Sequence, residues 1–223
     1  MFDFSSREAS ALTLLRCQEA LEKGETNVVA EVLKGQGTFY EMNHYPEGDV
    51  FDTSSGSQYY YHAHRGPEQE HGHFHLFLRV SAFDKDIAPA RGEEVSEHWP
   101  EGDEALMHLV GISMDAYGLP QGLFVTNRWV TDETWFSAED VIRHLDRFAV
   151  THATPNWAVN LWLTAFLRLF REEIIALIRE RDRQIAAARK SAPGADVLED
   201  RHLEILAWQP VDLAATLAPF VRK

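Results

Sequence analysis

Residues 59–79 of the chain read YYYHAHRGPEQEHGHFHLFLR, and this stretch constrains the fold more than any other. Aromatic residues and leucines occupy its two ends, as is typical of β-strands, and a Gly-Pro pair marks a turn between them. The pattern predicts an antiparallel hairpin whose loop spans residues 65–70, RGPEQE. Five of the eleven histidines of the chain lie in this hairpin: His62, His64, His71, His73 and His75.

The spacing of these histidines decides which way they face. Because side chains alternate between the two faces of a strand, we expect all five to share one face of the hairpin, together with Tyr60 and Arg79. In the natural register the opposed pairs are Tyr60 with His75, His62 with His73, and His64 with His71. Opposed residues have Cβ atoms about 4.5–5.5 Å apart, so their imidazoles can converge on one ion.

This convergence predicts a site for one divalent metal, either iron or zinc, with copper as a further option. The expected ligands are His62, His64, His73, His75 and Glu68. Glu70 and His71 are expected to orient the imidazoles from outside the ligand set. Two other interpretations stay open: a solvated polar face, and catalysis by histidine without a metal.

Three further residues are candidates for the chemistry around the metal. Tyr60 could donate a proton or a hydrogen bond, and Arg79 or Arg128 could position an anionic group of a substrate. Arg128 lies in a stretch expected to be a strand, where it could instead pair with a buried carboxylate. His108 is interpreted either as a ligand from a neighbouring strand or as a core residue. The hypothesis is an oxygenase or hydrolase acting on a small polar substrate, with a non-catalytic metal sensor or storage module as the alternative.

The rest of the chain is expected to be helical at both ends and β-rich between them. Apolar periodicity predicts helices over residues 6–23, 28–34, 137–149 and 154–190, and one or two short amphipathic helices in the segment that follows Pro193-Gly194. Thr154 and Pro155 are expected to cap and begin the long helix. Five or six strands are expected between residues 38 and 135, including a hairpin formed by LMHLVGIS and LFVTNRWV.

Helices and strands that are segregated along the chain indicate an α+β fold. We expect a single domain with a central antiparallel sheet, either open or rolled toward a cupin-like barrel, flanked by the terminal helices. Residues 1–36 would form the first helical segment, residues 37–136 the β-rich core with the metal site, and residues 137–223 the second helical segment. The length and apolar face of the last segment also predict a homodimer.

Composition excludes several classes of function. Lys and Arg total 21 and Asp and Glu total 35, giving a net charge of −14 that disfavours nucleic acids and anionic membranes. Cys17 is the one cysteine, so any metal must be held by histidine and carboxylate, and a reducing compartment is expected. The N-terminus MFDFSSREAS lacks the pattern of an export signal, which favours the cytoplasm. No glycine-rich phosphate loop is present. A small molecule is therefore the expected partner.

Two known motifs resemble parts of the hairpin. The spacing of Gly56, His62, His64 and Glu68 is similar to the first half of the first cupin motif, and the resemblance implies that His62, His64 and Glu68 ligate a divalent metal inside a small barrel. Val125 stands where the second cupin motif has a ligand histidine, so His108 or His73 would substitute.

The second motif is HGHFHLF, residues 71–77, which resembles the signature of histidine-triad phosphohydrolases. That resemblance implies a metal-free enzyme in which His73 attacks a nucleotide phosphorus. Over most of its length, through QYYYHAHR, EHGHFHLFLR and LFVTNRWVTDETW, the chain is similar to an uncharacterised bacterial family, a domain of unknown function.

Overall fold

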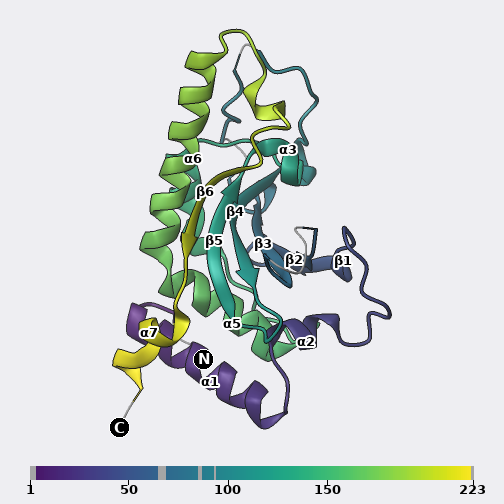
Figure 1. Cartoon of the computed structure of the whole chain (residues 1–223), viewed down its shortest axis with the longest axis vertical. Coiled ribbons are helices and arrows are strands. Elements are labelled where there is room, and N and C mark those ends of the chain that lie inside the picture. The colour runs from purple at the N-terminus through teal and green to yellow at the C-terminus, as the bar shows by residue number, and fades with distance from the viewer. Residues whose placement is uncertain (1–3, 65–68, 85–86, 93, 222–223) are drawn as a thin grey trace.

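The computed structural model describes residues 4–64, 69–84, 87–92 and 94–221. These residues form an antiparallel sheet whose six strands follow chain order (Figure 1). The strands are β1 (Tyr45–Asp52), β2 (Ser57–His62), β3 (Gly72–Arg79), β4 (Leu106–Met114), β5 (Pro120–Thr126) and β6 (Ile205–Pro210). The helices are α1 (Arg7–Lys23), α2 (Val28–Leu33), α3 (Arg128–Thr131), α4 (Ala138–His144), α5 (Trp157–Leu169), α6 (Arg171–Ser191) and α7 (Leu213–Leu217). Short 3₁₀ turns lie at Val80–Ala82, Gly102–Glu104, Leu145–Arg147, Val197–Glu199 and Ala218–Phe220.

The sheet is open. In the part of the chain that the structure describes, β1 pairs with β2 and β6 pairs with β5, and the two outer strands do not pair with each other. The expected α+β class with a central antiparallel sheet is therefore confirmed, whereas the closed, cupin-like barrel is not.

The edge strand β6 lies in a segment for which the sequence predicts short helices. It alternates between exposed and half-buried positions, with Leu206 buried and Trp208 half exposed.

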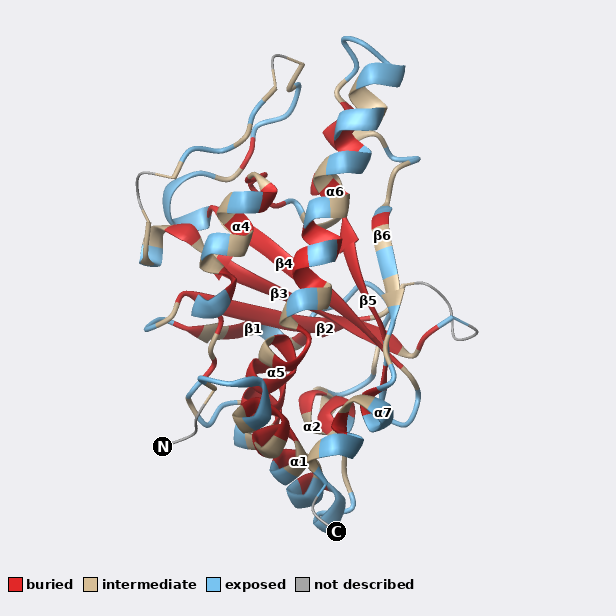
Figure 2. Cartoon of the chain, turned by 90° about the vertical axis from the view of Figure 1, so that its left-hand side faces the viewer, coloured by how far each residue is buried: buried red, intermediate tan, exposed pale blue. Residues whose placement is uncertain are grey.

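Helices cover one face of the sheet. Figure 2 shows α4 and α6 lying across this face, with α5 below them and α1 packed beside α5. Tyr59, Tyr61 and Phe74 point from β2 and β3 into the apolar core beneath the helices. The Tyr59 hydroxyl donates a hydrogen bond of 2.6 Å to Oδ1 of the buried Asn160 in α5. The histidines of these strands lie on the opposite face of the sheet, since side chains alternate along a strand.

The helical predictions are confirmed at the N-terminus and in α4. The side chains of Ser6, Asn27 and Ser137 accept hydrogen bonds from the first backbone N–H groups of α1, α2 and α4. These residue types are the preferred N-caps because they satisfy amide groups that the helix leaves without a partner.

The long helix expected over residues 154–190 is two helices. Asn156, and not Thr154, is the cap of α5, because its side chain accepts from the backbone N–H groups of Ala158 and Val159. Phe170 ends α5 with φ of −100° and ψ of 23°, and α6 begins at the next residue. The buried Phe170 ring packs on Phe166, so core packing at this point takes precedence over the continuous helical periodicity of the sequence.

Candidate metal centre

The hairpin of β2 and β3 has the predicted register. Tyr60 pairs with His75, and His62 pairs with His73. Alternation along the two strands therefore places His62, His73 and His75 on one face, opposite the helices. All three side chains are buried, with exposures of 7%, 0% and 1%.

The three imidazoles converge. One ligand nitrogen of each of His62, His73 and His75 lies within 4.8 Å of the others. The ring centroids of His62 and His73 are 4.5 Å apart, and those of His73 and His75 are 4.8 Å apart, with interplanar angles of 88° and 89°. The buried triad, which we call the histidine triad, could therefore hold a metal ion.

The carboxylate of Glu70 orients the ring of His73 from outside the triad. Glu70 is buried and its carboxylate accepts a hydrogen bond from Nδ1 of His73. A proton on Nδ1 leaves the lone pair of the ring on Nε2, which is the nitrogen that can bind a metal. Such carboxylate–imidazole pairs orient metal ligands and raise their basicity. Glu70 thus takes the outer position that the sequence predicted for it.

His108 takes the same position for His75. Nε2 of His108 lies 3.0 Å from Nδ1 of His75, and Nδ1 of His108 lies 3.4 Å from the Thr126 hydroxyl. Burial, with the charges of Arg181 and His73, lowers the pKa of His108 to about 3, so this imidazole is neutral. Two arrangements of protons satisfy both contacts: His75 donates to His108 and His108 donates to Thr126, or Thr126 donates to His108 and His108 donates to His75. The first arrangement leaves Nε2 of His75 for a metal.

A β-bulge explains how His108 reaches this face. His108 and Val110 are two positions apart on β4, so regular alternation would place both side chains on the same face of the sheet. Val110 lies in the core beneath the helices. The register between β3 and β4 shifts between Leu76 and Phe77, so that Leu76 pairs with Val110 but Phe77 pairs with His108. A bulge adds one residue to one strand and reverses the alternation beyond it. His108 is therefore neither an apolar-core residue nor part of the triad, but its outer partner.

Phe124 closes one side of the triad. Its ring contacts the edges of His73 and His75, with centroids 5.2 and 5.6 Å apart. The ring passes over Gly111, where an added Cβ would lie 2.2 Å from it. Gly111 pairs with both His75 and Phe124, so a residue without a side chain makes room for this contact.

The other predicted ligands have different places. The His64 ring lies beside the triad, 5.1 Å from that of His62 and 5.0 Å from that of His73, without belonging to the group whose nitrogens converge. Glu68 lies outside the described residues. His71 faces away from the triad, because it precedes the first residue of β3 and strand alternation does not reach it. Its Nδ1 bonds the hydroxyl of Tyr61 at 2.7 Å, on the side of the helices.

Tyr60 adjoins the triad and stays protonated. It is 5% exposed, and its ring lies 5.1 Å from that of His62 and 5.3 Å from that of His75. Burial, assisted by the charges of Asp49 and Glu133, raises the pKa of its hydroxyl well above the ordinary value for tyrosine. The hydroxyl is therefore a hydrogen-bond donor and a poor general acid.

The two candidate arginines differ in their surroundings. Arg79 ends β3 and lines a pocket beside β1, as described below. Arg128 is in the first turn of α3 and not in the expected strand, because Asn127 caps that helix. Its buried guanidinium donates to the carboxylates of Glu199 and Asp132 and to the backbone carbonyl of Glu133. The structural alternative, pairing with carboxylates, therefore describes Arg128.

Two residues near the triad lacked a clear signal in the sequence. Glu133 is fully buried, accepts a 2.9 Å hydrogen bond from the backbone N–H of His108, and has its pKa raised to about 7 by burial. His44 stacks on Tyr60 with ring centroids 3.6 Å apart. Both come from irregular segments, where no periodicity indicates which way a side chain points.

Fold and site together define an α+β protein with an open antiparallel sheet that carries a buried histidine triad. The chain belongs to the family described as Domain of unknown function (DUF6969), which it matches over residues 8–211. This confirms the expected membership of an uncharacterised family. No curated protein and no solved structure matches the chain. None of the described helices combines the length and the apolar character that crossing a membrane requires.

Proposed function

We propose that the protein is a metal-dependent hydrolase that binds one zinc ion through His62, His73 and His75 and acts on a small polar substrate. The observation that carries this proposal is the convergence of three buried imidazoles whose ligand nitrogens lie within 4.8 Å of one another. Three protein ligands with one remaining coordination position are typical of catalytic zinc sites.

The outer partners favour zinc over iron. Non-haem iron oxygenases commonly bind the metal with two histidines and one carboxylate. Here the carboxylate of Glu70 bonds Nδ1 of His73 and so supports an imidazole instead of joining the ligands. The donor set of the triad is then all nitrogen and neutral, which suits zinc or copper better than iron.

Each residue around the triad has a role in this proposal. Zinc, when bound, makes a nucleophile from water at neutral pH. Glu70 and His108 hold the proton on Nδ1 of His73 and of His75, so that both rings offer Nε2. Tyr60 donates a hydrogen bond to the substrate from its protonated hydroxyl. Burial by Phe124 excludes bulk water from one side and strengthens these interactions.

The metal-free alternative, in which His73 attacks phosphorus, is less well supported. The His73 ring is fully buried, and the rings of His62, His75 and Phe124 surround it. A phosphate group would have to displace one of these rings to reach it. Hydrolysis of phosphoesters that persists in excess chelator would favour this alternative over the zinc enzyme.

Elemental analysis of the untagged protein tests the proposal. We expect close to one zinc per chain in the wild type, and loss of the zinc in His62→Ala and in His73→Ala. His202→Ala is the matched control, since His202 is exposed and lies outside the triad. Protein that takes up no metal after reconstitution with zinc, iron and copper would overturn the proposal. Iron in place of zinc would redirect it to dioxygen chemistry.

A further inference from the structure

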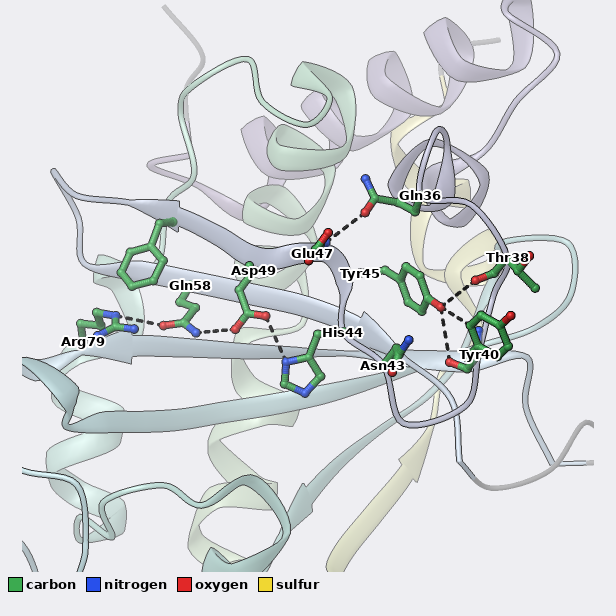
Figure 3. A pocket seen from close by; sticks show the side chains of 12 residues that line it. Gln36, Thr38, Tyr40, Asn43, His44, Tyr45, Glu47, Asp49, Gln58 and Arg79 are labelled. Atoms are coloured by element: carbon green, nitrogen blue, oxygen red, sulfur yellow. Dashed lines mark hydrogen bonds and ion pairs between the residues drawn. The ribbon is translucent and has the colours of Figure 1, made fainter.

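A pocket lies beside the histidine triad. It has a volume of about 710 Å³ and lies along β1 and the segment that precedes it (Figure 3). His44 lines this pocket, and its ring stacks on that of Tyr60 at 3.6 Å and lies 5.5 Å from that of His62. One imidazole therefore separates the pocket from a proposed zinc ligand. The volume falls in the range of small-molecule sites.

A row of hydrogen bonds fixes one wall of the pocket. Arg79 Nε donates to Gln58 Oε1 at 3.0 Å, Gln58 Nε2 donates to Asp49 Oδ2 at 2.6 Å, and His44 Nδ1 lies 3.0 Å from Asp49 Oδ1. Figure 3 shows these four side chains in line. A bulge in β1 turns Asp49 into this row, with φ of 59° at Asp49 and 82° at Gly48. The wall is thus preorganised.

The charges of the wall disfavour an anionic ligand. Arg79 is the pocket's cation, and its guanidinium is engaged by Gln58, by the carbonyl of Asp103 at 2.7 Å, and by the ring of Phe51, whose centroid is 4.0 Å away. The carboxylates of Glu47 and Asp49 also line the pocket. A carboxylate or phosphate would meet two negative groups and an arginine that already has partners.

The remaining lining suits hydroxyl groups. Gln36, Thr38 and Asn43 offer amides and a hydroxyl, which can each donate or accept a hydrogen bond. The Tyr40 ring is 60% exposed and provides an apolar surface at the rim. A sugar ring or a cyclic polyol presents hydroxyls at its edges and apolar C–H groups on its faces, and so matches both kinds of surface.

We propose that this pocket binds the substrate of the zinc site and that the substrate is an uncharged, hydroxyl-rich molecule of the sugar or polyol class, carrying the ester or glycosidic bond that water cleaves. The assignment rests on the proposed function, since it places the substrate within one imidazole of the triad. The row from Arg79 to His44 positions the hydroxyls, and Tyr40 packs on a face of the ring. Arg79 thereby fixes the wall and does not bind an anion, in contrast to the role expected from the sequence.

Binding of defined probes tests the pocket. D-xylose, D-glucose and myo-inositol would be titrated into the ¹⁵N-labelled full chain and followed by amide chemical shifts, with D-gluconate and glucose 6-phosphate as charged counterparts. We expect at least one neutral probe to bind, to shift amides within residues 36–58, and to bind at least fivefold more tightly than the charged probes. Failure of all three neutral probes, or tighter binding of a charged one, would overturn the proposal.

Variants separate the pocket from the metal site. Tyr40→Ala should weaken probe binding at least fivefold, whereas Tyr117→Ala, which removes another exposed ring outside this pocket, should leave it unchanged. Equal effects of the two variants would overturn the assignment. Zinc content is measured on the same samples. If the probes bind a protein that takes up no metal on reconstitution, the pocket is upheld and the proposed zinc enzyme is overturned. If the protein holds zinc but binds no probe, the zinc site is upheld and the assignment of the pocket is overturned.

Discussion

Nδ1 of His75 and Nε2 of His108 lie 3.0 Å apart, in a contact that joins β3 to β4 behind the histidine triad. Both side chains are buried, with exposures of 1% and 2%. A buried contact between two imidazoles is costly unless one ring donates and the other accepts. The pair therefore couples the tautomer of His75, a proposed zinc ligand, to that of His108.

Replacement of His108 should weaken zinc binding without removing a ligand. We expect His108→Leu to lower zinc affinity by about 10–100-fold, as is common for partners that orient metal ligands. His108→Gln should recover much of the loss, because its amide oxygen can accept from Nδ1 of His75. Competition titration with a zinc chelator measures both.

The matched control for this prediction is Val110→Ala, which removes buried methyl groups from the other face of β4. It should lower the melting temperature and leave the zinc affinity unchanged. If Val110→Ala weakened zinc binding as much as His108→Leu does, general destabilisation and not ligand orientation would explain the effect.

Zinc should raise the melting temperature of the wild type. A ligand that binds only the folded state stabilises it by about 2.7 kcal/mol at a free concentration of 100 times its Kd. For a chain of this size that corresponds to about 5–10 °C. Calorimetry with and without zinc measures the increment, and His62→Ala should show almost none. An equal increment in His62→Ala would place the bound metal elsewhere.

The raised pKa of Glu133 predicts that the stability of the folded protein changes with pH. The pKa of this carboxyl in the folded protein is raised from 4.5 to about 7 by burial, against the opposing charges of Arg181 and Arg128. The folded state thus favours the protonated carboxyl, and this contribution is complete below pH 4.5 and is lost as the pH rises through 7. The full difference corresponds to about 3 kcal/mol.

The variant Glu133→Gln should remove this pH dependence while its amide oxygen still accepts from the backbone of His108. We expect the melting temperature of the variant, relative to that of the wild type, to rise by several degrees between pH 5 and pH 8. A difference that stays constant over this range would show that Glu133 does not change its protonation there.

The hydrogen bond from Tyr59 to Asn160 should contribute to the free energy of unfolding, because it joins β2 to α5. Tyr59→Phe removes the donor to Oδ1 of Asn160, and leaves a buried acceptor without its partner. The expected cost is about 1–3 kcal/mol in the free energy of unfolding. Urea denaturation measures it, and Tyr117→Phe, at a side chain that is 80% exposed, should have no measurable effect. Equal stability of the Tyr59 variant and the wild type would contradict the prediction.

The part of the site that lies on one hairpin could be predicted from the sequence, because strand alternation and a short loop determine which residues meet. This reasoning placed His62 opposite His73 and Tyr60 opposite His75. It failed for His71, which lies just before the strand, and it could not assign His108, because the bulge beside Phe77 reverses the alternation of β4. Bulges depend on packing between strands and leave no periodic signal.

The same distinction applies to the fold. Helix caps such as Ser137 are local interactions, and the predicted start of that helix is confirmed. The strand β6 is not local in this sense. It pairs with β5, and Trp208 packs over Gly122 of that strand, where an added Cβ would lie 2.6 Å from the indole. Its own sequence has a mixed pattern that predicts short amphipathic helices, and tertiary contacts take precedence over this weak propensity.

The sheet order also bears on when the triad can assemble during synthesis of the chain. All three residues of the triad lie on the adjacent strands β2 and β3, with His75 only thirteen positions after His62. Closing so short a loop costs little entropy. All three proposed zinc ligands are present in the chain once it extends through His75, whereas α5 and α6 follow much later in the sequence. His108 follows later, on β4, so we expect the three proposed ligands and Glu70 to come together before the outer partner of His75 is in place.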